Sequence, residues 1–90
     1  MWNDGDIFKT KDSDLACYLL TQDDKFRMTG VETTQGERDQ TIVWFLFEPL
    51  IPQDAVGELL RDYRNGVCLV EPRKYAYRRR QIKNIIHKHL

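Results

Sequence analysis

The sequence predicts a single compact α+β domain (α/β-like), in which three helices and a three-stranded sheet follow the order α-β-β-α-β-α. Three observations predict this fold class. Apolar residues recur at helical spacing in three segments, they alternate or run together in three shorter ones, and polar, Gly or Pro residues separate these segments. With 90 residues, of which 41% are hydrophobic and 11% aromatic, the chain can bury one modest core, so residues 1–90 are expected to form one domain.

The first helix is predicted at residues 11–22. Thr10 and Asp12 are both suitable N-caps, because their side-chain oxygens can accept hydrogen bonds from the free N–H groups of a helix start. Asp12 and Asp14 also place negative charge where the helix dipole favours it. The buried stripe of this helix is expected to consist of Leu15, Ala16, Leu19 and Leu20.

Two strands are predicted to follow this helix. Phe26 and Met28 alternate with polar neighbours, which indicates a half-buried strand at about 26–33, and TTQGERDQ has the composition of a hairpin connection. TIVWFLF then predicts a central strand at 41–48 with apolar residues on both sides. Such a strand needs cover on both faces, from helices or from a partner chain. One side carries Ile42, Trp44 and Leu46, and the other carries Val43, Phe45 and Phe47.

The second half of the chain predicts a helix, a strand and a helix. Asp54 is expected to cap a helix with the apolar stripe Val56, Leu59, Leu60 and Tyr63, and Asn65-Gly66 is expected to end it. The apolar run at 67–70 predicts a third strand, which a right-handed crossover would place parallel to the central strand. The last helix is expected to begin near Arg73, with a core face of Tyr75, Ile82, Ile85, Ile86 and His89.

Four segments occur in this order: DIFKTKDSDLACYLL, TIVWFLFEP, LLRDYRNG and VEPRKYAYRRRQIKNII. Together they resemble a small uncharacterised domain family, a domain of unknown function associated with phage and bacterial genomes. The matching residues are packing and capping residues that cover most of the chain. The resemblance therefore implies a fold and a phage or mobile-element context, and it assigns no activity and no functional residue.

The composition argues for a cytoplasmic protein without a membrane partner. The longest apolar run, Ile42 to Phe47, covers six residues, whereas a transmembrane helix needs about 18. The acidic start MWNDGDIFKTKD lacks the basic region of a signal peptide. Cys17 and Cys68 are expected to be buried free thiols in a reducing compartment, although one disulfide stays open as an alternative.

We expect no enzymatic activity, metal, cofactor or small-molecule substrate. Ser13 stands at a predicted helix start, where capping is its ordinary role. His87 and His89 are two positions apart, so a helix would direct them to different sides rather than to one metal ion. The stretch TGVETTQGERD lacks the glycine spacing and the Lys of a phosphate-binding loop.

The formal net charge of zero conceals a separation of charge along the chain. Residues 1–48 contain five Lys or Arg against ten Asp or Glu, and residues 49–90 contain nine against four. From Arg73 to Leu90 there are seven basic residues and no acid. A helix with cations over most of its exposed circumference could follow a phosphate backbone. We therefore predict DNA or RNA binding of low sequence specificity through Arg73, Lys74, Tyr77, Arg78, Arg79, Arg80, Lys83 and Lys88, with Tyr77 stacking on a base or bonding a phosphate.

Two alternatives remain open at this point. The basic residues could be only the solvated face of a packing helix, and Arg78 and Arg79 could pair with acids of the N-terminal half. The chain could instead be a protein–protein interaction module, either a homodimer or a phage-type inhibitor of a host protein, with Trp2, Trp44 and Phe47 as large anchors. A contiguous apolar patch along one face of residues 42–47 would favour this second alternative.

Overall fold

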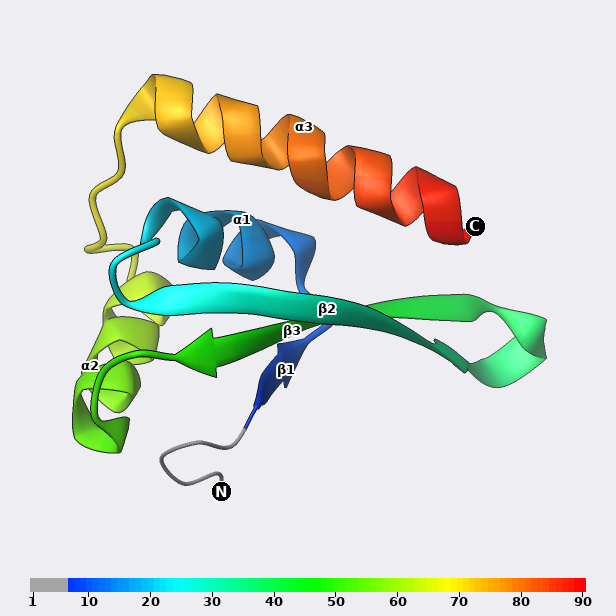
Figure 1. The fold of residues 1–90 in the computed structure, drawn as a ribbon, viewed down its shortest axis with the longest axis horizontal. Coiled ribbons are helices and arrows are strands. Elements are labelled where there is room, and N and C mark those ends of the chain that lie inside the picture. Colours follow the sequence, from blue (N-terminus) through cyan, green and yellow to red (C-terminus); the bar gives the residue numbers. More distant parts are fainter. Residues whose placement is uncertain (1–6) are drawn as a thin grey trace.

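The computed structural model describes residues 7–90, which form a three-stranded antiparallel sheet and three helices (Figure 1). Strand β3 lies between β1 and β2, so the sheet order is β1-β3-β2. The predicted α+β class is confirmed, but the order along the chain is β-α-β-β-α-α rather than α-β-β-α-β-α. The elements are β1 (Phe8–Thr10), α1 (Ser13–Thr21), β2 (Phe26–Gln35), the single turn η1 (Glu37–Asp39), β3 (Thr41–Pro49), α2 (Gln53–Arg64) and α3 (Pro72–His89).

The strand predicted at residues 67–70 is wrong. These residues form a loop between α2 and α3, and the side chain of Leu69 is 92% exposed. The third strand is β1, which pairs antiparallel with β3 and sets Phe8 opposite Phe47 and Thr10 opposite Phe45. Strand β3 therefore has β1 on one side and β2 on the other. No side of β3 is left for the parallel strand that the sequence predicted.

Helix α1 begins at Ser13, two residues after the predicted start at 11, and ends at Thr21 rather than at 22. Asp12 is the N-cap, and its Oδ1 accepts hydrogen bonds from the N–H groups of Asp14 at 3.0 Å and Leu15 at 3.2 Å. Thr10, the other suitable cap, lies two residues before Asp12 and contacts it. Its Oγ1 accepts a hydrogen bond from the N–H of Asp12 at 3.0 Å.

The N-cap of helix α2 lies two residues before the predicted one. Pro52 is the N-cap, and Asp54 lies inside the first turn, where its charge still suits the helix dipole. The end of α2 is as predicted. Asn65 is the C-cap, and Gly66 follows with φ of 72°, a left-handed conformation that glycine adopts without a steric penalty.

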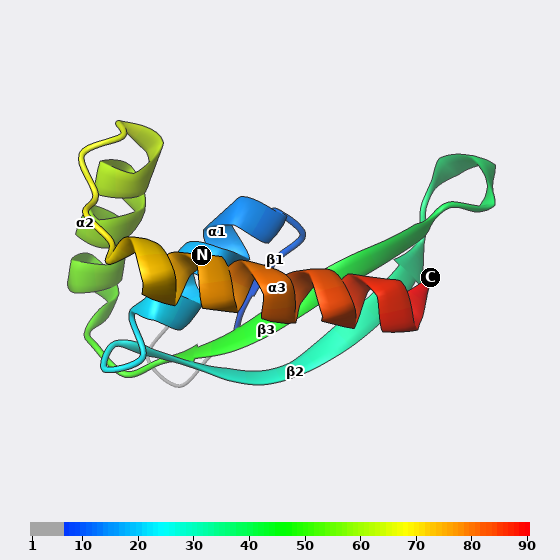
Figure 2. The same ribbon diagram turned by 90° about the horizontal axis from the view of Figure 1, so that it is seen from above.

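Helices α1 and α3 lie on the same face of the sheet, and α2 lies near the end where β3 finishes (Figures 1 and 2). Tyr18 of α1 stacks on Tyr63 of α2 with ring centroids 5.4 Å apart, which joins two of the three helices. His89, predicted on the core face of α3, is exposed instead, and its Nδ1 lies 2.9 Å from the carbonyl oxygen of Ile85. The most completely buried large side chains are Phe45, Phe47, Leu19, Ile82, Val56 and Cys17.

Within residues 7–90, helices cover only one of the two apolar faces of β3, so cover of the other face by a partner chain stays a prediction. Phe45 and Phe47 face α1 and α3 and are 1% and 0% exposed. Trp44 and Leu46 point to the opposite face, where they are only partly buried. No helix among residues 7–90 has the length and hydropathy to cross a bilayer.

Candidate nucleic-acid interface

Helix α3 carries every basic residue that the sequence singles out. It begins at Pro72, whose fixed φ suits a first helical position, and Glu71 caps it by accepting a hydrogen bond from the N–H of Lys74 at 2.7 Å. Ile82 is buried, and three further side chains pack against the core at helical spacing: Tyr75, Ile85 and Ile86. This stripe fixes the rotation of α3, so the opposite side of the helix must face solvent.

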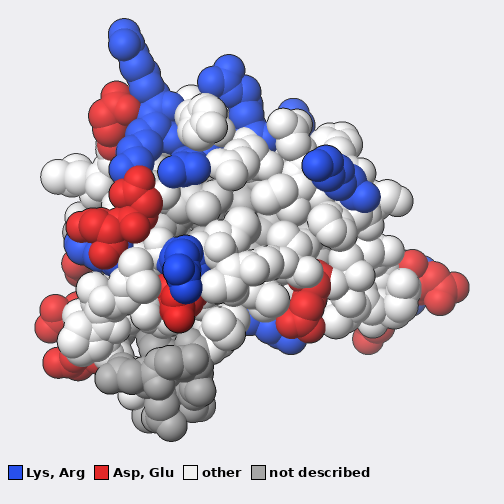
Figure 3. All heavy atoms as spheres, viewed as in Figure 1, with Lys and Arg blue, Asp and Glu red and all other residues white. Residues whose placement is uncertain are grey.

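Five of the predicted basic residues of α3 are exposed; four lie on its solvent side, and Arg79 lies at the margin of the core stripe, toward α1. They make no ion pair with any residue between 7 and 90. Tyr77 lies on the same side and is 57% exposed. Figure 3 shows Lys and Arg side chains along the margin of the molecule that α3 forms. We call these five residues the α3 ridge: Arg73, Arg79, Arg80, Lys83 and Lys88.

Lys74 and Arg78 turn away from the ridge toward Asp23. The Nζ of Lys74 lies 3.3 Å from the Asp23 carboxylate, and the Nη2 of Arg78 lies 3.8 Å from it. Arg78 also donates a hydrogen bond to Gln81 Oε1 at 2.9 Å, and its guanidinium lies 5.4 Å from the ring centre of Tyr77. The two arginines that the sequence left open therefore differ, because Arg78 pairs with an acid, whereas Arg79 is exposed and makes no ion pair with residues 7–90.

A groove of about 240 Å³ runs between α1 and α3 beside the ridge. Asp14 and Cys17 of α1 line one side, and Arg79 and Lys83 line the other. Burial raises the pKa of the Cys17 thiol, and the Asp14 carboxylate raises that pKa further, so the thiol is held in its neutral form. A neutral buried thiol is a poor nucleophile. The described residues also contain no group of three or more His, Cys, Asp or Glu side chains that could hold a metal ion.

Acidic side chains gather at the two ends of the molecule, and a few also lie beside α3, among them Asp14, Asp23 and Glu71. Those at the two ends lie around α2 and at the tip of the β2–β3 hairpin (Figure 3). Their exposed members include Asp54, Glu58 and Asp62 on α2 and Glu37 and Asp39 at the hairpin tip. A chain of zero formal net charge therefore carries an unequal distribution of charge over its surface, and such a field orients a charged partner as it approaches.

Comparison with known proteins adds no identification, because no family model, curated protein or solved structure matches the chain. The resemblance to a phage-associated domain family therefore stays a prediction. Trp2, predicted as an anchor for a protein partner, lies outside the described residues.

Proposed function

We propose that the protein binds nucleic acid through backbone phosphates along the α3 ridge, with low sequence specificity. The observation that carries this proposal is the exposure of five cations along one helix, without ion-pair partners among residues 7–90. At 1.5 Å per residue, Arg73 and Lys88 lie about 22 Å apart along the helix, a length over which a duplex carries about 13 phosphates. The helix is therefore long enough to contact several of them.

Tyr77 stands among these cations and would stack on an unpaired base or donate a hydrogen bond to a phosphate. Lys74 and Arg78 take a different place in the proposal. They would reach a phosphate only after their ion pairs with Asp23 break. Their contribution to phosphate binding is therefore smaller than that of the α3 ridge. Contacts from Lys and Arg to phosphates carry no direct sequence information, which is why we expect low specificity. The protein would then act as a small cytoplasmic accessory protein in the phage or mobile-element context that the resemblance implies.

The first test is to titrate labelled single- and double-stranded DNA and RNA with the purified protein at two salt concentrations. If the five ridge cations each neutralise one phosphate, a duplex gives a slope of about −4.5 in log affinity against log salt. Affinity should then fall by about 10²- to 10³-fold between 50 and 200 mM salt. Absence of binding at the lower concentration would overturn the proposal.

Two charge-reversal variants test whether the α3 ridge is the surface that contacts nucleic acid. The double substitution Arg80→Glu and Lys83→Glu reverses two charges of the ridge and touches no buried side chain, so it should abolish most binding without changing the unfolding temperature. The matched control is Arg61→Glu with Arg64→Glu, two exposed residues on α2 that give the same change in net charge. Equal losses from both pairs would mean that net charge, and not the ridge, determines binding.

A further inference from the structure

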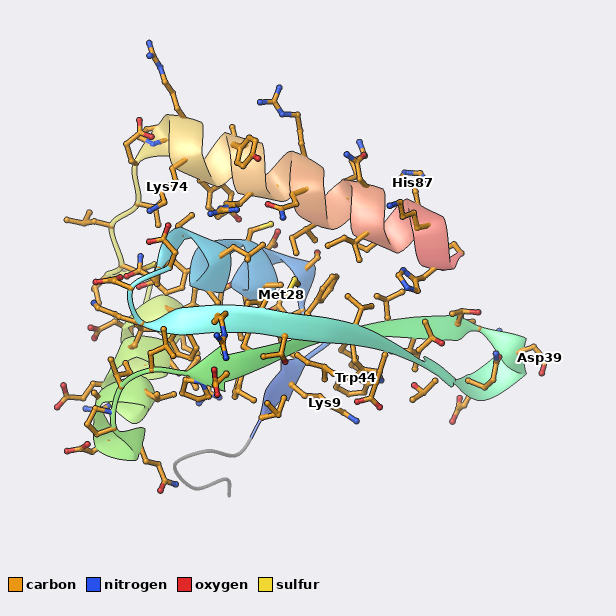
Figure 4. The ribbon with its side chains drawn as sticks, viewed as in Figure 1. Lys9, Met28, Asp39, Trp44, Lys74 and His87 are labelled. Atoms are coloured by element: carbon orange, nitrogen blue, oxygen red, sulfur yellow. The ribbon has the colours of Figure 1, made fainter. Side chains whose placement is uncertain are left out.

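The face of the sheet that points away from α1 and α3 has an apolar centre. In an antiparallel pair, residues directly opposite each other point to the same face. Lys9 is opposite Leu46 and Glu32 is opposite Trp44, so all four lie on this face. Figure 4 shows Lys9 and Trp44 pointing away from the helices, whereas Met28 points toward them. We call this surface the open face; its apolar centre is Ile42, Trp44 and Leu46.

Trp44 is fixed in place at the centre of the open face. Its indole N–H donates a hydrogen bond to Thr34 Oγ1 at 2.9 Å. The Nζ atoms of Lys9 and Lys11 lie 4.9 and 5.9 Å from the ring centre, at distances where a cation is attracted to an indole. A large aromatic side chain held in one orientation loses little entropy when a partner covers it, which is a property of binding hot spots.

The charges around this apolar centre are distributed unequally between its two margins. Lys9 and Lys11 lie at the margin that β1 forms, and Glu32 lies on β2 at the opposite margin. The other two charged residues of the face, Arg27 and Glu48, pair with each other. The face therefore has an unpaired positive margin, an apolar centre and an unpaired negative margin, as judged within the described part of the chain.

This arrangement is complementary to itself. Consider a second copy rotated by half a turn about an axis parallel to β3 and lying between the two open faces. The β1 margin of each copy then lies over the β2 margin of the other, which brings Lys9 and Lys11 to Glu32 of the second copy. Trp44 and Leu46 of the two copies meet at the centre. Such an interface uses the same patch twice, as closed dimers do, and two sheets packed face to face are a common arrangement.

We propose that the open face is the interface of a homodimer in which two sheets pack face to face. A nucleic acid is a poorer occupant, because Glu32 and Glu48 would lie against its phosphates. In the dimer the two α3 helices lie on opposite outer surfaces, so the open face and the α3 ridge are separate sites. The dimer can therefore be tested without any nucleic acid, and failure of the proposed function would leave its test unaffected.

The test is sedimentation velocity of the full chain from micromolar to near-millimolar concentration. The weight-average mass should approach that of a dimer as concentration rises. Leu46→Glu places a carboxylate at the apolar centre and should raise the dissociation constant about 100-fold or more, because that charge would be buried without a partner. Circular dichroism and an unfolding curve check that this variant folds.

A charge exchange tests how the two copies are oriented in the dimer, and it does not require that the Leu46→Glu variant folds. Lys9→Glu alone places like charges at the two margins and should weaken the dimer about tenfold. Adding Glu32→Lys to the same chain restores opposite charges and should recover most of the affinity. A wild-type chain that stays monomeric, or a double variant no better than the single one, would overturn the proposal. Association that appeared only after removal of residues 1–6 would also overturn it, since that segment would then be the occupant.

Discussion

The carboxylate of Asp23 lies 3.3 Å from the Nζ of Lys74 and connects the turn after α1 to the first turn of α3. The same carboxylate lies 3.8 Å from Arg78, one turn further along α3. Asp23 is 57% exposed, so these ion pairs contribute little to the free energy of unfolding. Their main effect is electrostatic, because one acid partly neutralises two of the cations that the sequence marks as phosphate contacts.

We expect Asp23→Asn to increase the affinity for nucleic acid. The substitution removes the acid that holds Lys74 and Arg78 and keeps the size of the side chain. Affinity at low salt should rise about 3- to 10-fold, and the salt slope should steepen by about one unit for each cation that gains a phosphate. The measurement is the same titration at two salt concentrations, with the unfolding temperature recorded alongside.

Asp24→Asn is the matched control for this prediction. Asp24 is adjacent in sequence, is exposed and makes no ion pair within residues 7–90, yet its substitution gives the same change in net charge. It should raise the affinity much less. Equal gains from both variants would show that Asp23 acts only through the net charge of the protein.

Features with a local signal could be predicted from the sequence. The cap at Asp12 and the left-handed residue Gly66 depend on contacts within a few positions, and so does the apolar stripe that sets the rotation of α3. That rotation is also why Arg80 and Lys83 could be assigned to the solvent side.

Features that depend on distant contacts could not be predicted. Strand β1 has three residues, too few for a period, and its pairing with Phe45–Phe47 joins segments more than 30 positions apart. The apolar run at 67–70 has the composition of a strand, but β1 and β2 already occupy the two sides of β3 with which it was predicted to pair. Asp23 belongs to TQDDK, which predicts only the end of a helix, and nothing local indicates its pairing with Arg78.

The tyrosines of the helical layer predict a loss of stability in strong alkali. Burial raises the pKa of Tyr63 to about 12, and the carboxylates of Asp12 and Asp14 add repulsion of the phenolate. The unfolded chain ionises nearer the ordinary pKa of 10, so between about pH 10 and 12 the folded state binds more protons than the unfolded state. The contribution of Tyr63 is therefore complete below pH 10 and is lost as the pH rises toward 12.

Tyr63→Phe isolates this effect. The variant keeps the ring that stacks on Tyr18 and removes the ionising group. Its free energy of unfolding should fall less steeply with pH above 10 than that of the wild type, by at most about 1.4 kcal/mol per pH unit. Urea unfolding at a series of pH values measures both slopes, and the other ionising groups cancel in the comparison. Parallel curves would mean that Tyr63 ionises alike in both states.

The tip of the β2–β3 hairpin holds a strained pair of residues. Arg38 and Asp39 both have φ of 60°, and the N–H of Gln40 donates a hydrogen bond to the carbonyl oxygen of Glu37 at 3.3 Å. Two successive positive φ values are typical of the hairpin turns that favour Asn followed by Gly. A long side chain such as that of Arg38 is disfavoured in this conformation by about 1 kcal/mol.

We therefore expect Arg38→Asn with Asp39→Gly to raise the free energy of unfolding by about 1 kcal/mol, since both replacements suit a left-handed backbone. The gain should appear as a higher midpoint of urea unfolding at an unchanged slope. Arg38→Ala is the control, because alanine removes the same charge but keeps the steric conflict of a Cβ at positive φ. An equal gain from Arg38→Ala would show that the gain does not come from relief of the left-handed turn geometry.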